Sequence, residues 1–126
     1  EYEKAFDALT SGVPPTDPQG QLYLGRTQME LGQMAQAKET FEDLVRFHED
    51  YTQAYYYLGE SSGRLGDMFG AHYNLGRFYQ RKGDMRNAGF HLNRAMKLAT
   101  SETQKKLVDR ELKALDPKHE KKPPAG

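Results

Sequence analysis

The small and hydrophobic residues of this chain recur with a fixed period. A leucine–glycine pair with an alanine twelve positions after its glycine occurs three times, separated first by 34 and then by 17 residues. A stretch of 17 residues is one helix plus one turn, so half the period equals one element, as expected of stacked helical hairpins. The recurring positions are Leu24, Gly25 and Ala37, then Leu58, Gly59 and Ala71, then Leu75, Gly76 and Ala88.

Three glycine turns separate the predicted helices. Each turn is a glycine, one polar residue and a methionine, and the glycines are Gly32, Gly66 and Gly83. Glycine ends a helix readily because it adopts the left-handed backbone conformation without steric cost. Asp67 and Asp84 directly follow two of these glycines, where a short acidic side chain caps the next helix.

Further cap signals complete the prediction of the elements. Asp17 stands before a proline, and Ser101 and Gln104 have the spacing of a capping box. The pattern predicts an all-α solenoid of six to seven antiparallel helices, near residues 1–10, 18–31, 35–48, 52–65, 68–82, 85–99 and 102–115. Residues 1–17 are then the end of a preceding helix and a proline-rich connector, 18–115 a repeat domain, and 116–126 a disordered tail. Because the chain begins without methionine, inside a predicted helix, we expect it to be a piece of a longer protein.

The composition fits a thin stack of helices better than a thick globule. The apolar fraction is 37% and the mean hydropathy is −0.91, and in a stack each element buries only the stripe that faces its neighbours. The absence of cysteine excludes disulfides and thiolate metal sites. No apolar run reaches the ~18 residues of a membrane span, so membrane insertion is not expected.

Charge is distributed unevenly along the chain. Residues 1–63 carry 4 basic and 11 acidic side chains, a net charge of −7, whereas residues 64–126 carry 14 basic and 7 acidic ones, a net charge of +7. Such a dipole orients a partner or a neighbouring domain, although solvated helix faces of different composition produce the same pattern. Nucleic acid is not an expected partner, because the pI is 7.2 and no recognition motif is present.

The repeated positions resemble the tetratricopeptide pattern W-x2-L-G-x2-Y followed by A-x3-F. The resemblance implies a right-handed solenoid of helical hairpins that binds other proteins. One ambiguity stays open, because the helix at 68–82 both closes the second copy and opens the third. Either two repeats are followed by extra helices, or the register shifts by one helix. The copies are Gln21, Leu24, Gly25, Gln28, Ala37 and Phe41; Tyr55, Leu58, Gly59, Ser62, Ala71 and Leu75; and His72, Leu75, Gly76, Tyr79, Ala88, Leu92 and Ala95.

A narrower resemblance covers residues 55–115. The sequence there is similar to that of the C-terminal repeat domain of BepA-like zinc metallopeptidases. The similar stretches are residues 58–67, 71–73, 78–83 and 92–99. That resemblance implies a bacterial, periplasmic protein in which the repeats dock on a peptidase domain and engage outer-membrane assembly proteins. The peptidase motif HExxH is not found here, since His48-Glu49 lacks the second histidine. The family's catalytic residues therefore correspond to nothing in this chain.

The repeat pattern predicts which side chains line a binding groove. Tyr55 takes the large-aromatic core position, whereas Leu22 falls among the positions that face the groove. Tyrosine, methionine and arginine are enriched at interfaces because they combine contact area with polar ends. Repeats that clamp a terminal carboxylate need lysine and asparagine here, so this groove suits an apolar or mixed segment instead. For Tyr56 and Tyr57, packing on the next helix is the alternative to facing the groove. The predicted groove residues are Tyr23, Arg26, Met29, Glu30, Tyr56, Tyr57, Glu60 and Arg64.

No catalytic chemistry, cofactor or metal is predicted. The four histidines lack the i, i+4 spacing of a helical zinc pair, although His72 and His91 lie on different helices that have the potential to meet. The basic group of Arg77, Arg81, Lys82, Arg86 and Arg94 is read as a solvated face, with an acidic partner as the alternative. The predicted function is a protein-interaction module of a periplasmic metallopeptidase, and the alternatives are a secretion or pilus assembly adaptor and a cytoplasmic location.

Overall fold

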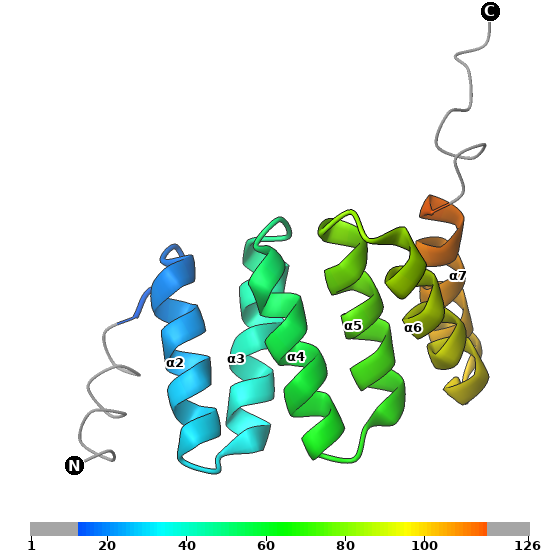
Figure 1. The fold of residues 1–126 in the computed structure, drawn as a ribbon. Helices are drawn as coiled ribbons and strands as arrows, with labels where there is room; N and C mark the ends of the chain where they lie inside the picture. Colours follow the sequence, from blue (N-terminus) through cyan, green and yellow to red (C-terminus); the bar gives the residue numbers. More distant parts are fainter. Residues whose placement is uncertain (1–12, 116–126) are drawn as a thin grey trace, which may run out of the picture.

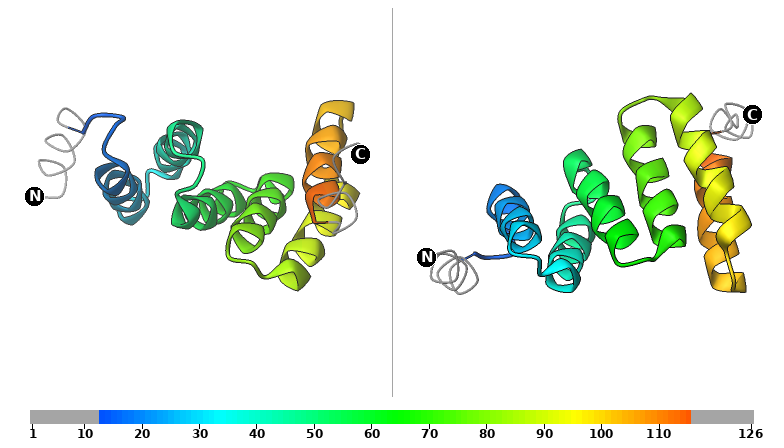
Figure 2. Two further views of the ribbon diagram at one scale, coloured as in Figure 1. Left: turned by 90° about the horizontal axis from the view of Figure 1, so that it is seen from above. Right: turned by 60° about the horizontal axis from the view of Figure 1, so that its bottom comes forward.

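A computed structural model describes residues 13–115, and within them the protein is built from helices without strands. The helices follow one another in a row (Figures 1 and 2). This confirms the predicted all-α solenoid, and every observed boundary lies within one residue of its expectation. The predicted helix at 1–10 and the predicted tail at 116–126 lie outside the described residues. The elements are α2 Pro18–Glu30, α3 Met34–Phe47, α4 Thr52–Arg64, α5 Met68–Arg81, α6 Met85–Leu98 and α7 Glu102–Ala114.

The helix ends form where local chemistry predicts them. Asp17, Asp67 and Asp84 each accept a hydrogen bond from a backbone N–H three residues further on, at 2.9, 2.9 and 3.1 Å. These bonds satisfy donors that the first turn of a helix leaves free. The turn glycines Gly32, Gly66 and Gly83 have φ of 77°, 86° and 82°, the left-handed region that favours glycine.

The α7 start differs slightly from a standard capping box. Ser101 Oγ accepts a hydrogen bond from the Gln104 N–H at 3.1 Å. The Gln104 Oε1 accepts one in return, but from the N–H of Thr100 at 2.7 Å rather than from that of Ser101. The reciprocal pair therefore spans one residue more than the sequence pattern predicts.

The leucine–glycine pair inside each repeat copy marks a close contact between successive helices. A Cβ built on Gly25 would lie 2.3 Å from the Phe41 ring, and one built on Gly76 would lie 2.6 Å from Leu92. On Gly59 the nearest atom would be Leu75 Cγ, at 3.0 Å. In all three hairpins the glycine faces the residue sixteen positions later, so α2–α3, α4–α5 and α5–α6 pack by the same rule.

Helix α5 consequently belongs to two hairpins. Its Leu75 packs on Gly59 of α4, while the neighbouring Gly76 receives Leu92 of α6. The most extensive helix contacts of the described chain are those that α5 makes with α4 and α6. The sequence pattern is ambiguous because α5 forms one repeat-type hairpin with α4 and another with α6.

The core is divided along the stack. One cluster lies among α2, α3 and α4 and includes Phe41, Leu44 and Tyr55, all at most 1% exposed. Tyr55 is confirmed as a core residue, and its hydroxyl donates to the Glu49 carbonyl at 2.6 Å. A second cluster centred on Leu92 and Val108 joins α6 to α7. None of the helices within residues 13–115 combines the length and apolar character needed to cross a membrane.

Candidate functional site

A hollow of about 460 Å³ lies between α2 and α4. Successive hairpins place these helices as neighbours on one side of the stack, with α3 behind them (Figure 1). The hollow contains seven of the eight predicted groove residues, and Thr27 completes its lining. The lining residues are Tyr23, Arg26, Thr27, Met29 and Glu30 from α2, and Tyr57, Glu60 and Arg64 from α4.

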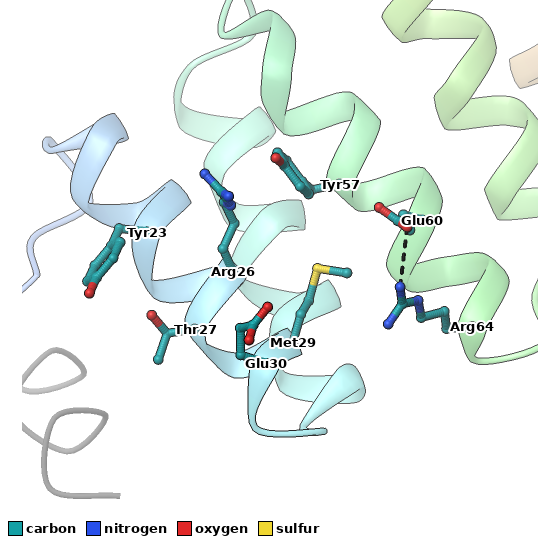
Figure 3. A pocket seen from close by; sticks show the side chains of 8 residues that line it. All are labelled: Tyr23, Arg26, Thr27, Met29, Glu30, Tyr57, Glu60 and Arg64. Carbon is teal, nitrogen blue, oxygen red and sulfur yellow. Dashed lines mark hydrogen bonds and ion pairs between the residues drawn. The ribbon is translucent and has the colours of Figure 1, made fainter. Parts of the chain in front are cut away.

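Tyr57 forms the aromatic platform of this groove. Its ring stacks on the buried Phe41 with centroids 5.7 Å apart, which fixes its position. The guanidinium of Arg26 lies 5.2 Å from the centroid of the Tyr57 ring, within the range of a cation–π contact. Arg26 and Tyr57 therefore bridge α2 and α4 across the hollow (Figure 3).

The remaining lining residues give the groove mixed chemistry. Met29 is directed toward α4, while Tyr23 lies on the side of α2 away from α4 (Figure 3) and is 60% exposed. Glu60 and Arg64 form an ion pair at 3.4 Å, which is exposed and therefore contributes little stability of its own. An aromatic and thioether floor with charged edges has a composition typical of protein interfaces.

Two residues at predicted groove positions lie outside this hollow. Tyr56 does not line the hollow, because its ring packs against Phe78 of α5 with centroids 5.5 Å apart and against Tyr57 edge-on at 5.2 Å. Leu22 also does not face the groove, since it is only 7% exposed and belongs to the core. The positions of both side chains are set by contacts with neighbouring helices, and the spacing of residues within one helix does not specify these contacts.

A second hollow of about 800 Å³, which the predicted groove positions do not include, lies on the opposite side of α4. Its lining includes Tyr73, Arg77 and Arg81 of α5. They stand 17 residues after Tyr56, Glu60 and Arg64, so carrying the groove positions forward by one half-period would have found them. From the sequence, Arg77 and Arg81 are expected on a solvated face, with an acidic partner as the alternative.

The two histidines on α5 and α6 do meet. Nδ1 of His72 and Nδ1 of His91 are 3.0 Å apart, and Tyr79 stacks on His91 with centroids 5.4 Å apart. Burial, with the nearby Arg94 as a smaller cause, lowers the pKa of His72; burial, then His72 and Arg94, lowers the pKa of His91. Within residues 13–115, no three His, Asp or Glu side chains gather at a potential metal position. The lowered pKa values favour the neutral form of both rings at neutral pH.

Comparison with known families gives two matches. Residues 19–50 and residues 69–102 each match the tetratricopeptide repeat family. The chain contains a tetratricopeptide repeat domain. Such domains bind proteins or peptides, so the chain is a protein-interaction module. A comparison with curated proteins found no match.

The positions of the matches bear on the register. The first covers α2 and α3 and the second covers α5 and α6, and their starts lie 50 residues apart. This is close to one and a half periods of 34, so α4 stands between two matched repeats. The two matched repeats, α2–α3 and α5–α6, are therefore offset from each other by one helix, while α4 packs on α5 by the same rule as the matched hairpins.

Proposed function

We propose that the groove between α2 and α4 holds a segment of a partner protein with mixed apolar and polar character. The observation that carries this proposal is the Tyr57 platform, which Phe41 supports from below and Arg26 covers at 5.2 Å. A rigid, partly buried aromatic ring is the kind of anchor on which binding energy concentrates. The ring is surrounded by two arginines and two glutamates, Arg26, Arg64, Glu30 and Glu60. Because both signs of charge are present, these side chains orient a bound segment more than they attract it over a distance.

The larger context is a bacterial periplasmic metallopeptidase of the BepA-like type. This context is supported by sequence similarity to the repeat domain of that family at residues 58–67, 71–73, 78–83 and 92–99. In that context the groove binds either the peptidase domain or an outer-membrane assembly protein. The alternative is an adaptor of a secretion or pilus assembly system, in the periplasm or the cytoplasm. Reading the gene upstream of Glu1 separates the two, because an HExxH motif there supports the peptidase and its absence supports the adaptor.

Site-specific photocrosslinking in cells tests the groove itself. A benzophenone amino acid at position 57 should crosslink a discrete partner, because that ring forms the centre of the hollow. Phe90 is a matched control, since it is an aromatic residue of α6 that is 56% exposed and does not line this hollow. Equal crosslinking from both positions, or none from position 57, would refute the groove assignment.

A further inference from the structure

The shared helix α5 gives the chain a second groove that faces the other way. On α4 the first groove uses Tyr57, Glu60 and Arg64, whereas the second uses Leu58 and Ser62. With about 100° between successive residues, these two sets lie on opposite faces of the same helix. The second groove has α4 and α5 as its floor and α3 and α7 as its walls.

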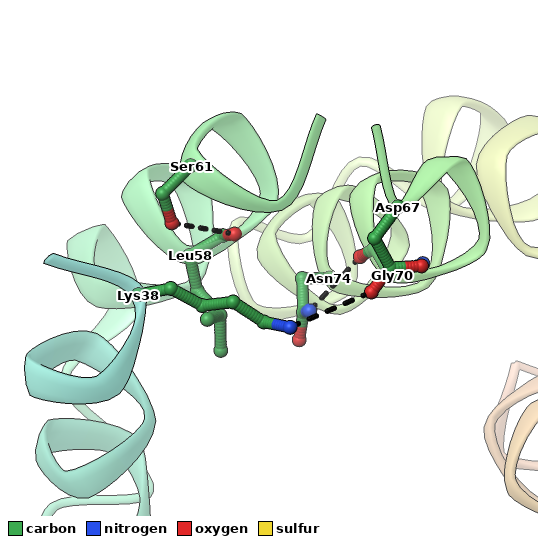
Figure 4. A network of polar contacts seen from close by, with 6 residues as sticks. All are labelled: Lys38, Leu58, Ser61, Asp67, Gly70 and Asn74. Carbon is green, nitrogen blue, oxygen red and sulfur yellow. Dashed lines mark hydrogen bonds and ion pairs between the residues drawn. The ribbon is translucent and has the colours of Figure 1, made fainter. Parts of the chain in front are cut away.

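One end of the second groove is held together by polar contacts (Figure 4). Lys38 of α3 reaches across to Asp67 at 3.6 Å, and Asp67 in turn caps α5 through the Gly70 N–H. Asn74 donates to the Gly70 carbonyl at 2.9 Å. The carboxylate of Asp67 is therefore already used, and this end of the groove is fixed in shape.

The centre of the groove presents arginines that are held in place by aromatic rings. The guanidinium of Arg77 lies 4.7 Å from the ring centroid of Tyr55 and 5.0 Å from that of Tyr73. The guanidinium of Arg81 lies 4.2 Å from the Tyr55 centroid, and its Nε donates to the Glu49 carbonyl at 3.1 Å. Arg110 of α7 lines the same hollow. Stacking of this kind orients a guanidinium in advance and reduces the entropy lost when it binds a ligand.

These arginines have no carboxylate partner within residues 13–115. The ion pairs found there involve other side chains, although Glu42, Glu49 and Glu111 also line the hollow.

The sequence of α5 favours an anionic occupant. Met68–Arg81 contains two arginines, Arg77 and Arg81, and no aspartate or glutamate. Phe69 and Leu107 add apolar surface beside the arginines. Arginine forks match carboxylates in geometry as well as in charge.

We propose that this second groove binds an acidic segment of a partner protein, with carboxylates on Arg77, Arg81 and Arg110 and an apolar side chain against Phe69 and Leu107. The surface is separate from the groove between α2 and α4. The chain would then hold two different segments at once, one on each side of α4.

Fluorescence anisotropy on the full 126-residue chain tests the proposal. The probe is a fluorescein-labelled peptide of sequence EELEELEE, and the uncharged peptide QQLQQLQQ is its control. Binding of the acidic peptide alone is expected. Arg81→Gln and Arg110→Gln should each raise its Kd about tenfold, because each removes a charge-assisted hydrogen bond.

Matched variants separate a specific groove from general attraction to the basic half. Arg86→Gln and Arg94→Gln remove the same charge from α6, outside the hollow, and should leave the Kd within twofold. Tyr57→Ala in the first groove should likewise leave it within twofold. Equal losses at Arg86 or Arg94, an equal loss at Tyr57, binding of the uncharged peptide, or no binding at all would each overturn the proposal.

Discussion

Adding a single methyl group at Gly76 tests the hairpin rule directly. In Gly76→Ala the new Cβ would lie 2.6 Å from Leu92 Cγ, 2.7 Å from its Cδ2 and 3.3 Å from its backbone nitrogen. Leu92 is fully buried, so its side chain cannot move into solvent to make room for the added methyl group. Overpacking of this kind costs about 1–3 kcal/mol, while alanine gains about 1 kcal/mol over glycine in helix propensity. We therefore expect a net loss of roughly 0–2 kcal/mol.

Gly89→Ala supplies the matched control for this substitution. Gly89 lies within α6, and a Cβ there would meet nothing within 4 Å. Only the propensity gain of about 1 kcal/mol then remains. The difference between the two variants isolates the contact with Leu92, and it should be about 1–3 kcal/mol.

Urea denaturation followed by circular dichroism at 222 nm measures both variants. A thermal melt gives a second readout, with about 4–8 °C expected for each kcal/mol. If Gly76→Ala stabilises the chain as much as Gly89→Ala does, then Gly76 does not face α6. In that case α5–α6 is not a hairpin of the repeat type.

Three further predictions follow from the same structure. Tyr57→Ala should weaken binding of the natural partner by about 2 kcal/mol in a titration while circular dichroism shows the helix content retained; normal binding would exclude Tyr57 as the anchor. Asp67→Ala should cost about 1 kcal/mol in urea denaturation because α5 loses its cap, whereas an unchanged midpoint would show that the cap is dispensable. Burial lowers the pKa of His72 and His91 from 6.5, so unfolding takes up protons and stability should fall as the pH drops below 6.5; His91→Gln should flatten that dependence, and an unchanged slope would contradict the assignment.

Local signals explain why the helices were predictable from sequence. The ends depend on contacts within three residues, as at Asp67 and Gly70, and on the conformational freedom of single glycines such as Gly66. The side of each helix that contacts its neighbour depends on the spacing of small residues, because small residues allow two helices to come close. Both kinds of information are contained in short stretches of the chain, so the fold class and the helix bounds follow from them.

The site was less predictable because its decisive contacts are not local. The direction of Tyr56 is set by Phe78 on the following helix, a contact that the spacing within α4 does not specify. The second groove needs α7 as a wall, yet only Val108 of that helix is fully buried, so its docking position leaves a weak pattern. The register was undecidable from pattern alone because α5 satisfies two patterns at once.

The shared helix also has a consequence for cooperativity. In an ordinary repeat array, stability is a sum of unit and interface terms, and a weak interface allows the two ends to melt separately. Here α5 belongs to the hairpin with α4 and to the hairpin with α6, so no interface separates these two hairpins. Fraying that begins at α6 removes the partner of α5 and thereby loosens α4. The N-terminal and C-terminal clusters should therefore unfold in a single transition, and a cut between them leaves one part without half of its hairpin.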